Sequence, residues 1–193
     1  MRLAIFGGTF DPIHKAHVAM AREAADQFQL DRVLFIPASD PPHKAGLTYA
    51  PYQDRLRMVE AACAGEPRFL VSQLEEGPGR SYSIDTIQRV RATLSASDQL
   101  FFLIGADAFA EMESWHRWQE VVAAVRFIVV SRPGHRYRIP EGASVERLET
   151  VDLPVSSSDM RSALAAGRRP AEIPKAVLRY IYQHGLYGVP VGA

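Results

Sequence analysis

Residues 3–17 of the chain read LAIFGGTFDPIHKAH, a short apolar run followed by two glycines and two histidines. The run from Leu3 to Phe6 predicts a buried strand, and apolar residues at helical spacing between residues 18 and 28 predict the helix that follows. Glycines at such a turn let the backbone approach a ligand closely, and a helix start offers it unpaired amides. This order of strand, glycine turn and helix favours a phosphate site.

The same alternation continues along the chain. Apolar runs at residues 33–36, 69–71, 100–104 and 127–130 each predict a buried strand, and helical spacing returns between residues 84 and 94. An order of strand, helix, strand, helix predicts an α/β protein with a Rossmann-like, doubly wound, mostly parallel sheet and helices on both faces. In such sheets, ligands bind beyond the carboxyl ends of the strands.

The carboxyl-terminal third differs from this pattern. It predicts one weak strand near residues 145–153, a helix that begins at residues 156–159 and stops at Gly167, and a second helix from about Pro174 to His184. We therefore expect a single domain over residues 1–193, with a helical portion of about 154–188 packed on the sheet. That helical end offers a face on which two copies could pair as a homodimer.

The composition excludes several classes of protein. With 193 residues, 47% hydrophobic and 23% charged, the chain is not disordered as a whole. Its 22 basic and 22 acidic residues give no net field for nucleic acid or an anionic membrane, so we expect neither partner. Cys63 is the single cysteine, and the apolar run at the amino terminus is too short for a signal peptide. These features predict a cytoplasmic protein.

His14 and His17 lie three residues apart, so in a helix they share one face and could donate to phosphate oxygens. The alternative is a glycine turn followed by two solvated histidines. The order GGTFDP, then His-x-x-His, resembles the signature of the nucleotidyltransferase superfamily that carries a His-x-Gly-His motif. Here Ala16 replaces the usual glycine, which puts a methyl group where helix and phosphates approach closely.

Residues 37–44, PASDPPHK, follow the second predicted strand. Three prolines stiffen this segment and leave His43 and Lys44 as an ordered basic pair, although it could also be a plain surface turn. A similar Pro-x-x-x-Pro-Pro-His-Lys occurs in the bacterial nicotinate mononucleotide adenylyltransferases, so the resemblance narrows to that family. The segment from Asp40 to Ala50 is the candidate for closing over substrate.

Residues 79–86, GRSYSIDT, resemble that family's Ser-Tyr-Thr-Ile-Asp-Thr element. Hydroxyls and free amides at a helix start can bind a small carboxylate, and the alternative is an ordinary helix cap by Ser81 or Ser83. The resemblance implies that Tyr82 and Thr86 hold the nicotinate ring and its carboxylate.

Residues 104–109, IGADAF, place Gly105 and Asp107 just past a strand, where a carboxylate can accept two ribose hydroxyls. Trp115, in the family-like WHRW of residues 115–118, offers a flat face to a pyridine ring, whereas we expect Trp118 in the core.

Residues 155–161, VSSSDMR, resemble the superfamily's Ile-Ser-Ser-Thr-x-Ile-Arg. As a lone motif this is a helix cap. In company with the other segments, Ser157, Ser158 and Arg161 predict a second phosphate cradle opposed to the first.

Together the matches cover residues 3–161 and imply transfer of the adenylyl group of ATP to nicotinate mononucleotide, with release of pyrophosphate. A phosphate monoester is already mostly ionised near pH 7, so no general base is needed and catalysis is alignment plus electrostatic stabilisation. We expect Mg²⁺ on the ATP phosphates and water, and no metal site built by the protein. The alternatives are an enzyme that prefers nicotinamide mononucleotide and a nucleotide-sensing module without catalysis, which Ala16 favours.

The predicted site residues fall into three groups. The catalytic group is His14, His17, Lys44 and Arg161. The ATP-binding group is Gly7, Gly8, Thr9, Phe10, His14, His17, Gly105, Asp107, Ser157, Ser158 and Arg161. The group for nicotinate mononucleotide is Thr9, His43, Lys44, Tyr82, Thr86 and Trp115.

Overall fold

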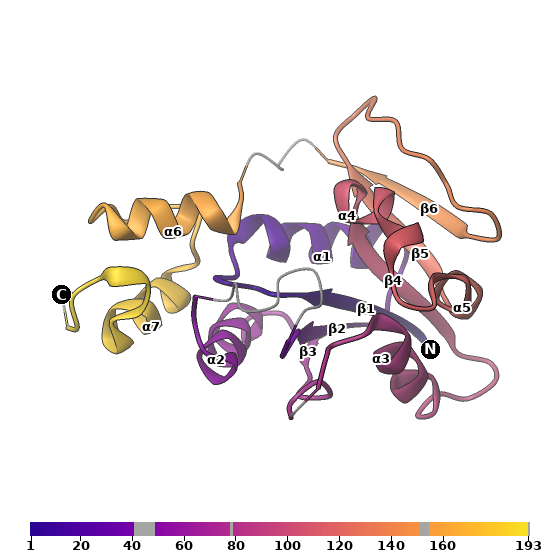
Figure 1. Cartoon of the computed structure of the whole chain (residues 1–193), viewed down its shortest axis with the longest axis horizontal. Helices are drawn as coiled ribbons and strands as arrows, with labels where there is room; N and C mark the ends of the chain where they lie inside the picture. The colour runs from indigo at the N-terminus through magenta and orange to yellow at the C-terminus, as the bar shows by residue number, and fades with distance from the viewer. Residues whose placement is uncertain (41–48, 78, 151–154, 193) are drawn as a thin grey trace.

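The strands expected from the apolar runs form one parallel sheet in the computed structural model, which describes residues 1–40, 49–77, 79–150 and 155–192. Every neighbouring pair is parallel and the order is β3-β2-β1-β4-β5-β6, which confirms the predicted Rossmann-like α/β fold (Figure 1). The strands are β1 (Arg2–Gly8), β2 (Arg32–Pro37), β3 (Phe69–Val71), β4 (Gln99–Gly105), β5 (Arg126–Ser131) and β6 (Ser144–Glu149).

Helices cover both faces of this sheet. Because side chains alternate along a strand, Ala4 and Phe6 of β1 join the core beneath α1, whereas Leu3 and Ile5 join the core with α3 and α5 on the other face (Figure 1). The helices are α1 (Lys15–Gln27), α2 (Tyr52–Cys63), α3 (Ser83–Arg91), α4 (Ala106–Ala110), α5 (Trp118–Ala124), α6 (Ser157–Ala165) and α7 (Lys175–His184), with short 3₁₀ turns at Met112–Ser114 and Leu186–Gly188.

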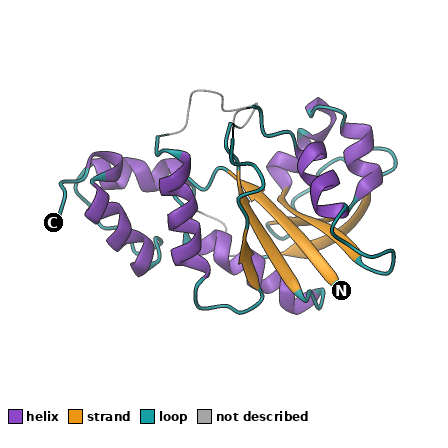
Figure 2. Ribbon diagram, turned by 90° about the horizontal axis from the view of Figure 1, so that it is seen from below, coloured by secondary structure: helices purple, strands orange, loops and turns teal. Residues whose placement is uncertain are grey.

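The carboxyl-terminal helices form as the sequence predicts. Ser156 caps α6 by accepting a hydrogen bond at its side-chain oxygen from the Asp159 backbone N, 3.1 Å away. The second helix, α7, follows Pro174 and ends at Gly185, whose φ of 62° is in the left-handed region that glycine adopts without strain. Both helices lie to one side of the sheet, near the carboxyl terminus (Figure 2).

Three boundaries differ from the expectation. The weak strand predicted at 145–153 is the edge strand β6, which ends at Glu149, and residues 151–153 lie outside the described residues. Helices α1 and α3 end at Gln27 and Arg91, so the periodic residues Phe28 and Leu94 pack from just beyond the helices.

Helix α2 has no counterpart in the sequence prediction. Its inner face carries Leu56, Met58 and Val59 together with Arg55, which is only 1% exposed. In a sequence, an arginine usually indicates an exposed position. Arg55 therefore interrupts the pattern of apolar residues by which the helix would be recognised.

In the part of the chain that the structure describes, no helix is long and apolar enough to cross a membrane.

Candidate functional site

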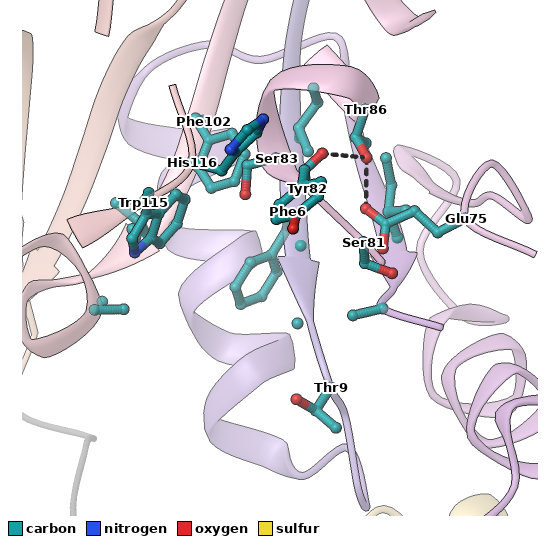
Figure 3. A pocket seen from close by; sticks show the side chains of 18 of the residues that line it. Phe6, Thr9, Glu75, Ser81, Tyr82, Ser83, Thr86, Phe102, Trp115 and His116 are labelled. Atoms are coloured by element: carbon teal, nitrogen blue, oxygen red, sulfur yellow. Dashed lines mark hydrogen bonds between the residues drawn. The ribbon is translucent and has the colours of Figure 1, made fainter. Parts of the chain in front are cut away.

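A cavity of about 460 Å³ opens where the strand order reverses, between the carboxyl ends of β1 and β4 (Figure 3). This is the place where doubly wound sheets bind ligands. The cavity is lined by Ile5, Phe6, Gly7, Gly8, Thr9, Ile36, Ala38, Glu75, Ser81, Tyr82, Ser83, Thr86, Phe102, Ile104, Gly105, Ala108, Ser114, Trp115 and His116.

Seven residues predicted from sequence meet in this cavity, although they come from four separate segments. They are Gly7, Gly8, Thr9, Tyr82, Thr86, Gly105 and Trp115. In Figure 3, Trp115 stands on one side and Thr86 on the other, with Thr9 toward the far end. An apolar cavity with a few polar groups at its rim suits a flat heterocycle that carries a polar substituent.

Gly8 lies close to the ring of Phe10. A Cβ at this position would lie 3.0 Å from ring atoms of Phe10, a tighter contact than most real Cβ atoms make, so a larger residue would require the ring to shift. The Phe10 side chain is buried in the core against Phe6 and Phe35, so any contact of this residue with ATP would come from its backbone.

Trp115 and Trp118 differ less in burial than the sequence analysis expects, which places Trp118 in the core and Trp115 in the site. Both are half-buried and both pack against the core cluster beneath α5. Trp115 meets Phe102 edge to face, with 6.1 Å between ring centroids, and only Trp115 lines the cavity.

The cavity also contains residues that the sequence reasoning missed. Thr86 donates its hydroxyl to Oε1 of Glu75 at 2.6 Å, and Oε2 of Glu75 is buried with no partner among the described residues. His116 lies against Tyr82, with 4.3 Å between ring centroids. The signal for His116 was its place beside Trp115, whereas Glu75 lies in a loop that matches no motif quoted above.

Neither Ser81 nor Ser83 caps α3, so that alternative is wrong. The cap residue is Tyr82, without a side-chain hydrogen bond, and Ser81 lies one position too early. Ser81 Oγ instead accepts from the backbone N of Ser39 at 2.9 Å and of Asp40 at 3.2 Å. It therefore joins the loop after β2 to the segment before α3.

Asp107 lies outside the large cavity, in a second one of about 310 Å³. Gly105 borders both cavities, so the two adjoin at the end of β4. Arg132 and His135 also line the second cavity and were missed, although they follow the carboxyl end of β5 and the same rule would have found them.

The two histidines form a stacked pair at the start of α1, with 3.7 Å between ring centroids. His17 Nδ1 accepts from the backbone N of His14 at 3.2 Å, as a capping box does. His14 is 4% exposed and burial lowers its pKa to about 4, so it is neutral at pH 7. The alternative of two solvated histidines is therefore wrong for His14.

This buried imidazole predicts a pH dependence of stability. Because the folded pKa of His14 lies below its usual value of 6.5, its contribution is complete above pH 6.5 and is lost as pH falls toward 4. A pKa difference of this size corresponds to about 3 kcal/mol. Urea unfolding at pH 7 and pH 4.5 measures the loss.

His14→Gln should remove this part of the pH dependence, whereas the exposed His135→Gln should leave it unchanged. If wild type and His14→Gln lose the same stability between the two pH values, His14 is not the group responsible.

The start of α6 is tied to the loop that leads into α1. Arg161 Nη1 donates to the Asp11 carbonyl at 2.8 Å, and Ser157 Oγ donates to the Pro12 carbonyl at 3.0 Å. The Arg161 guanidinium also lies over the Tyr49 ring, 4.1 Å from its centroid. The two predicted cradles therefore adjoin, with Ser158 exposed beside them. His43 and Lys44 lie outside the described residues.

Among residues 1–40, 49–77, 79–150 and 155–192, no group of three or more histidine, cysteine or acidic side chains could hold a metal ion.

Comparison with known proteins gives concordant matches. Residues 5–163 match the model of the cytidylyltransferase-like family. The chain is 62% identical to a probable nicotinate-nucleotide adenylyltransferase of Solibacter usitatus, over 97% of this chain and 100% of that protein. It is 40% identical to one of Acidothermus cellulolyticus, over 96% and 94%.

A solved structure of similar fold is the Plasmodium falciparum nicotinic acid mononucleotide adenylyltransferase complexed with NaAD. The TM-score is 0.79 at 19% identity, and the match covers 96% of this chain and 97% of that one.

Proposed function

The chain belongs to the nicotinate-nucleotide adenylyltransferases of the cytidylyltransferase-like family, and from that premise we propose which residues carry out its reaction. The enzyme transfers the adenylyl group of ATP to nicotinate mononucleotide, which gives nicotinate adenine dinucleotide and pyrophosphate in NAD biosynthesis. A phosphate oxygen of the mononucleotide attacks the α-phosphorus of ATP, the new P–O bond forms, and the bond to pyrophosphate breaks.

The nicotinate ring occupies the large cavity, against Trp115. Its carboxylate lies near the start of α3. There the backbone N atoms of Ser83 and Ile84 are the first two of the helix, and the first N–H groups of a helix have no acceptor within the helix itself. The side chain of Thr86 is a weaker candidate, because its hydroxyl proton is directed to Glu75. Thr86 therefore presents an acceptor to the cavity.

The ATP phosphates lie over the glycine turn and the start of α1. His17 donates from Nε2, because its Nδ1 is the acceptor for His14. Arg161 uses one N–H on the Asp11 carbonyl and has further N–H groups for phosphate oxygens. His14 is neutral, so its contribution is a positioned N–H or a stacking surface for His17, without a charge.

The attacking phosphate needs no base, since its second pKa is about 6. What limits the rate is the repulsion between anions and the charge that grows on the bridging and equatorial oxygens. Donors held in place before the reaction stabilise that charge without reorganising, and each can supply a hundredfold or more. Lys44 and His43 are assigned to the incoming phosphate on the sequence motif alone.

The ATP phosphates and water would hold Mg²⁺, which would offset the charge of the triphosphate. Mg²⁺ commonly keeps several waters and takes few protein ligands. The described residues fit this arrangement, because their acidic side chains near the cavities are separate: Glu75 bonds to Thr86, and Asp107 lies beside the second cavity.

The convergence of four separate segments on one cavity at the sheet's switch point carries this proposal. Pyrophosphate release tests it, measured with ATP alone and with ATP plus nicotinate or nicotinamide mononucleotide. We expect release only with a mononucleotide, and faster with the acid. ATP binding without release would instead indicate a nucleotide-sensing module.

Trp115→Ala should weaken nicotinate mononucleotide more than ATP. Loss of a stacking face is expected to raise the KM for the mononucleotide about tenfold, in line with aromatic stacking terms of about 1–2 kcal/mol, and to change the KM for ATP less than twofold. Steady-state kinetics with each substrate varied in turn measures both values.

Trp118→Ala is the matched control, because Trp118 packs on the same core cluster without lining the cavity. Equal losses for both substrates in Trp115→Ala, or the same pattern in Trp118→Ala, would contradict the assignment.

Three further features are proposed. The chain acts as one domain, supported by Val177 and Ile181 of α7, which share a core cluster with Phe6 of β1. The protein is cytoplasmic, supported by its single cysteine, Cys63, which is buried and has no second cysteine with which to form a disulfide. Two copies pair as a homodimer through the carboxyl-terminal helices, which sedimentation at micromolar concentration tests.

A further inference from the structure

We propose that Tyr187, in the 3₁₀ turn after α7, is a positioning residue for the catalytic loop between β1 and α1. Its hydroxyl donates to Oδ1 of Asp11 at 2.6 Å, across 176 positions of sequence. The inference rests on the proposed function only for its kinetic readout.

The Asp11 carboxylate is a buried junction. It is 3% exposed, and besides Tyr187 it accepts from the backbone N of Tyr49 at 2.7 Å and of Ala50 at 3.2 Å. The carboxyl-terminal turn, the catalytic loop and the chain just before α2 therefore meet at one side chain. A carboxylate held by several donors in a buried place fixes the positions of all of them.

Hydrogen bonds also hold the backbone of the loop between β1 and α1 in place. Carbonyl oxygens at Gly8, Thr9, Asp11 and Pro12 each accept a hydrogen bond. In that order, the donors are the backbone N of Ala38, the guanidinium groups of Arg55 and Arg161, and the side-chain hydroxyl of Ser157. Phe10 has a φ of 50°, a backbone conformation that residues other than glycine rarely adopt. The surrounding contacts must therefore maintain it.

Asp11 links Tyr187 to the phosphate-binding groups. Its carboxylate bonds to Tyr187, its carbonyl bonds to Arg161, and His14 follows three residues later. Without the Tyr187 hydroxyl, the one hydrogen bond that Oδ1 of Asp11 keeps among the described residues is the 3.2 Å bond from Ala50. A small displacement of aligned catalytic groups can lower the rate greatly. A shift at Asp11 that moves Arg161 and His14 therefore lowers the rate.

Tyr187 stays a donor over the working range of pH. Burial and the neighbouring charge of Asp11 both raise the pKa of Tyr187 far above its usual value of 10. The phenol is therefore protonated near neutral pH, where it donates to Asp11.

Tyr187→Phe tests the proposal, with Tyr180→Phe as a matched control. Tyr180 donates to Oδ1 of Asp54 at 2.8 Å, so each variant loses one tyrosine-to-aspartate hydrogen bond near the carboxyl terminus. We expect Tyr187→Phe to lower kcat about tenfold with each KM within twofold, and Tyr180→Phe to leave kcat unchanged. Equal kcat in both variants would overturn the proposal.

Coupling to Arg161 separates positioning from general damage. In an Arg161→Ala background, Tyr187→Phe should lower kcat by clearly less than tenfold further, because one of the two groups that it positions is gone. A full tenfold further loss would show that Tyr187 does not act through Arg161.

Amide hydrogen exchange supplies a readout that needs no activity. Tyr187→Phe should speed exchange at the Tyr49 and Ala50 amides at least tenfold, since both donate to Asp11, and Tyr180→Phe should not. Unchanged exchange overturns the positioning role even if wild type were inactive. A wild type without pyrophosphate release overturns only the proposed function.

Discussion

We expect His17→Ala to lower kcat by a hundredfold or more and to leave the fold intact. This is the size expected when one donor, held in place before the reaction, is removed from the developing charge. His17 is suited to that role because its ring is stacked on His14 and its Nδ1 is engaged with the His14 backbone N. The geometry leaves Nε2 to carry the proton.

His17→Gln separates the catalytic role from the structural one. Glutamine at the third helical position can still accept from the His14 backbone N through Oε1, as capping boxes do, but no imidazole ring holds its amide N–H at the position of the histidine Nε2. We expect the same loss of kcat as in His17→Ala with a melting temperature like that of wild type. His184→Ala, at the far end of α7, should be fully active. A folded His17 variant with near-normal turnover would reject the role.

We expect Arg55→Met to lower the free energy of unfolding by about 3–5 kcal/mol. This is the usual loss when one partner of a buried charged network is removed. Arg55 is 1% exposed and donates to the carbonyls of Thr9, Ala38, Ser39 and Ala50. Methionine fills much of the same volume but leaves those carbonyls without their Arg55 donor and removes a positive charge that interacts with Asp11. Urea unfolding at pH 7 measures the change.

Arg57→Met is the control on the same helix. Arg57 is exposed and forms an ion pair with Glu60 at 2.9 Å, so its loss should cost less than about 0.5 kcal/mol. Values for the two variants within about 1 kcal/mol of each other would contradict the structural importance of the Arg55 network.

The sheet could be predicted from sequence because its four central strands, β1, β2, β4 and β5, are mostly buried and carry continuous apolar runs. The site could be predicted as far as it lies on local motifs, since Gly8 and Gly105 end strands and Tyr82 is the cap residue of α3. Trp115 follows the 3₁₀ turn at Met112–Ser114, and its place in the family-like WHRW segment identified it. The superfamily resemblance supplied the rest of that list.

What could not be predicted depends on contacts between distant parts of the chain. Asp11 stands within the quoted GGTFDP motif, yet its partner Tyr187 is 176 residues away in a turn with no motif of its own. The burial of Arg55 is likewise visible only once the loops after β1 and β2 surround it. Burial also decides that His14 is neutral, which sequence spacing cannot show.

The most direct test is a crystal structure with nicotinate adenine dinucleotide bound. We expect the pyridine ring in the large cavity against Trp115, and a bridging phosphate oxygen within about 3 Å of Nε2 of His17. Phosphates bound away from the start of α1, or a pyridine ring seated beside Asp107 in the smaller cavity, would contradict the proposed mechanism.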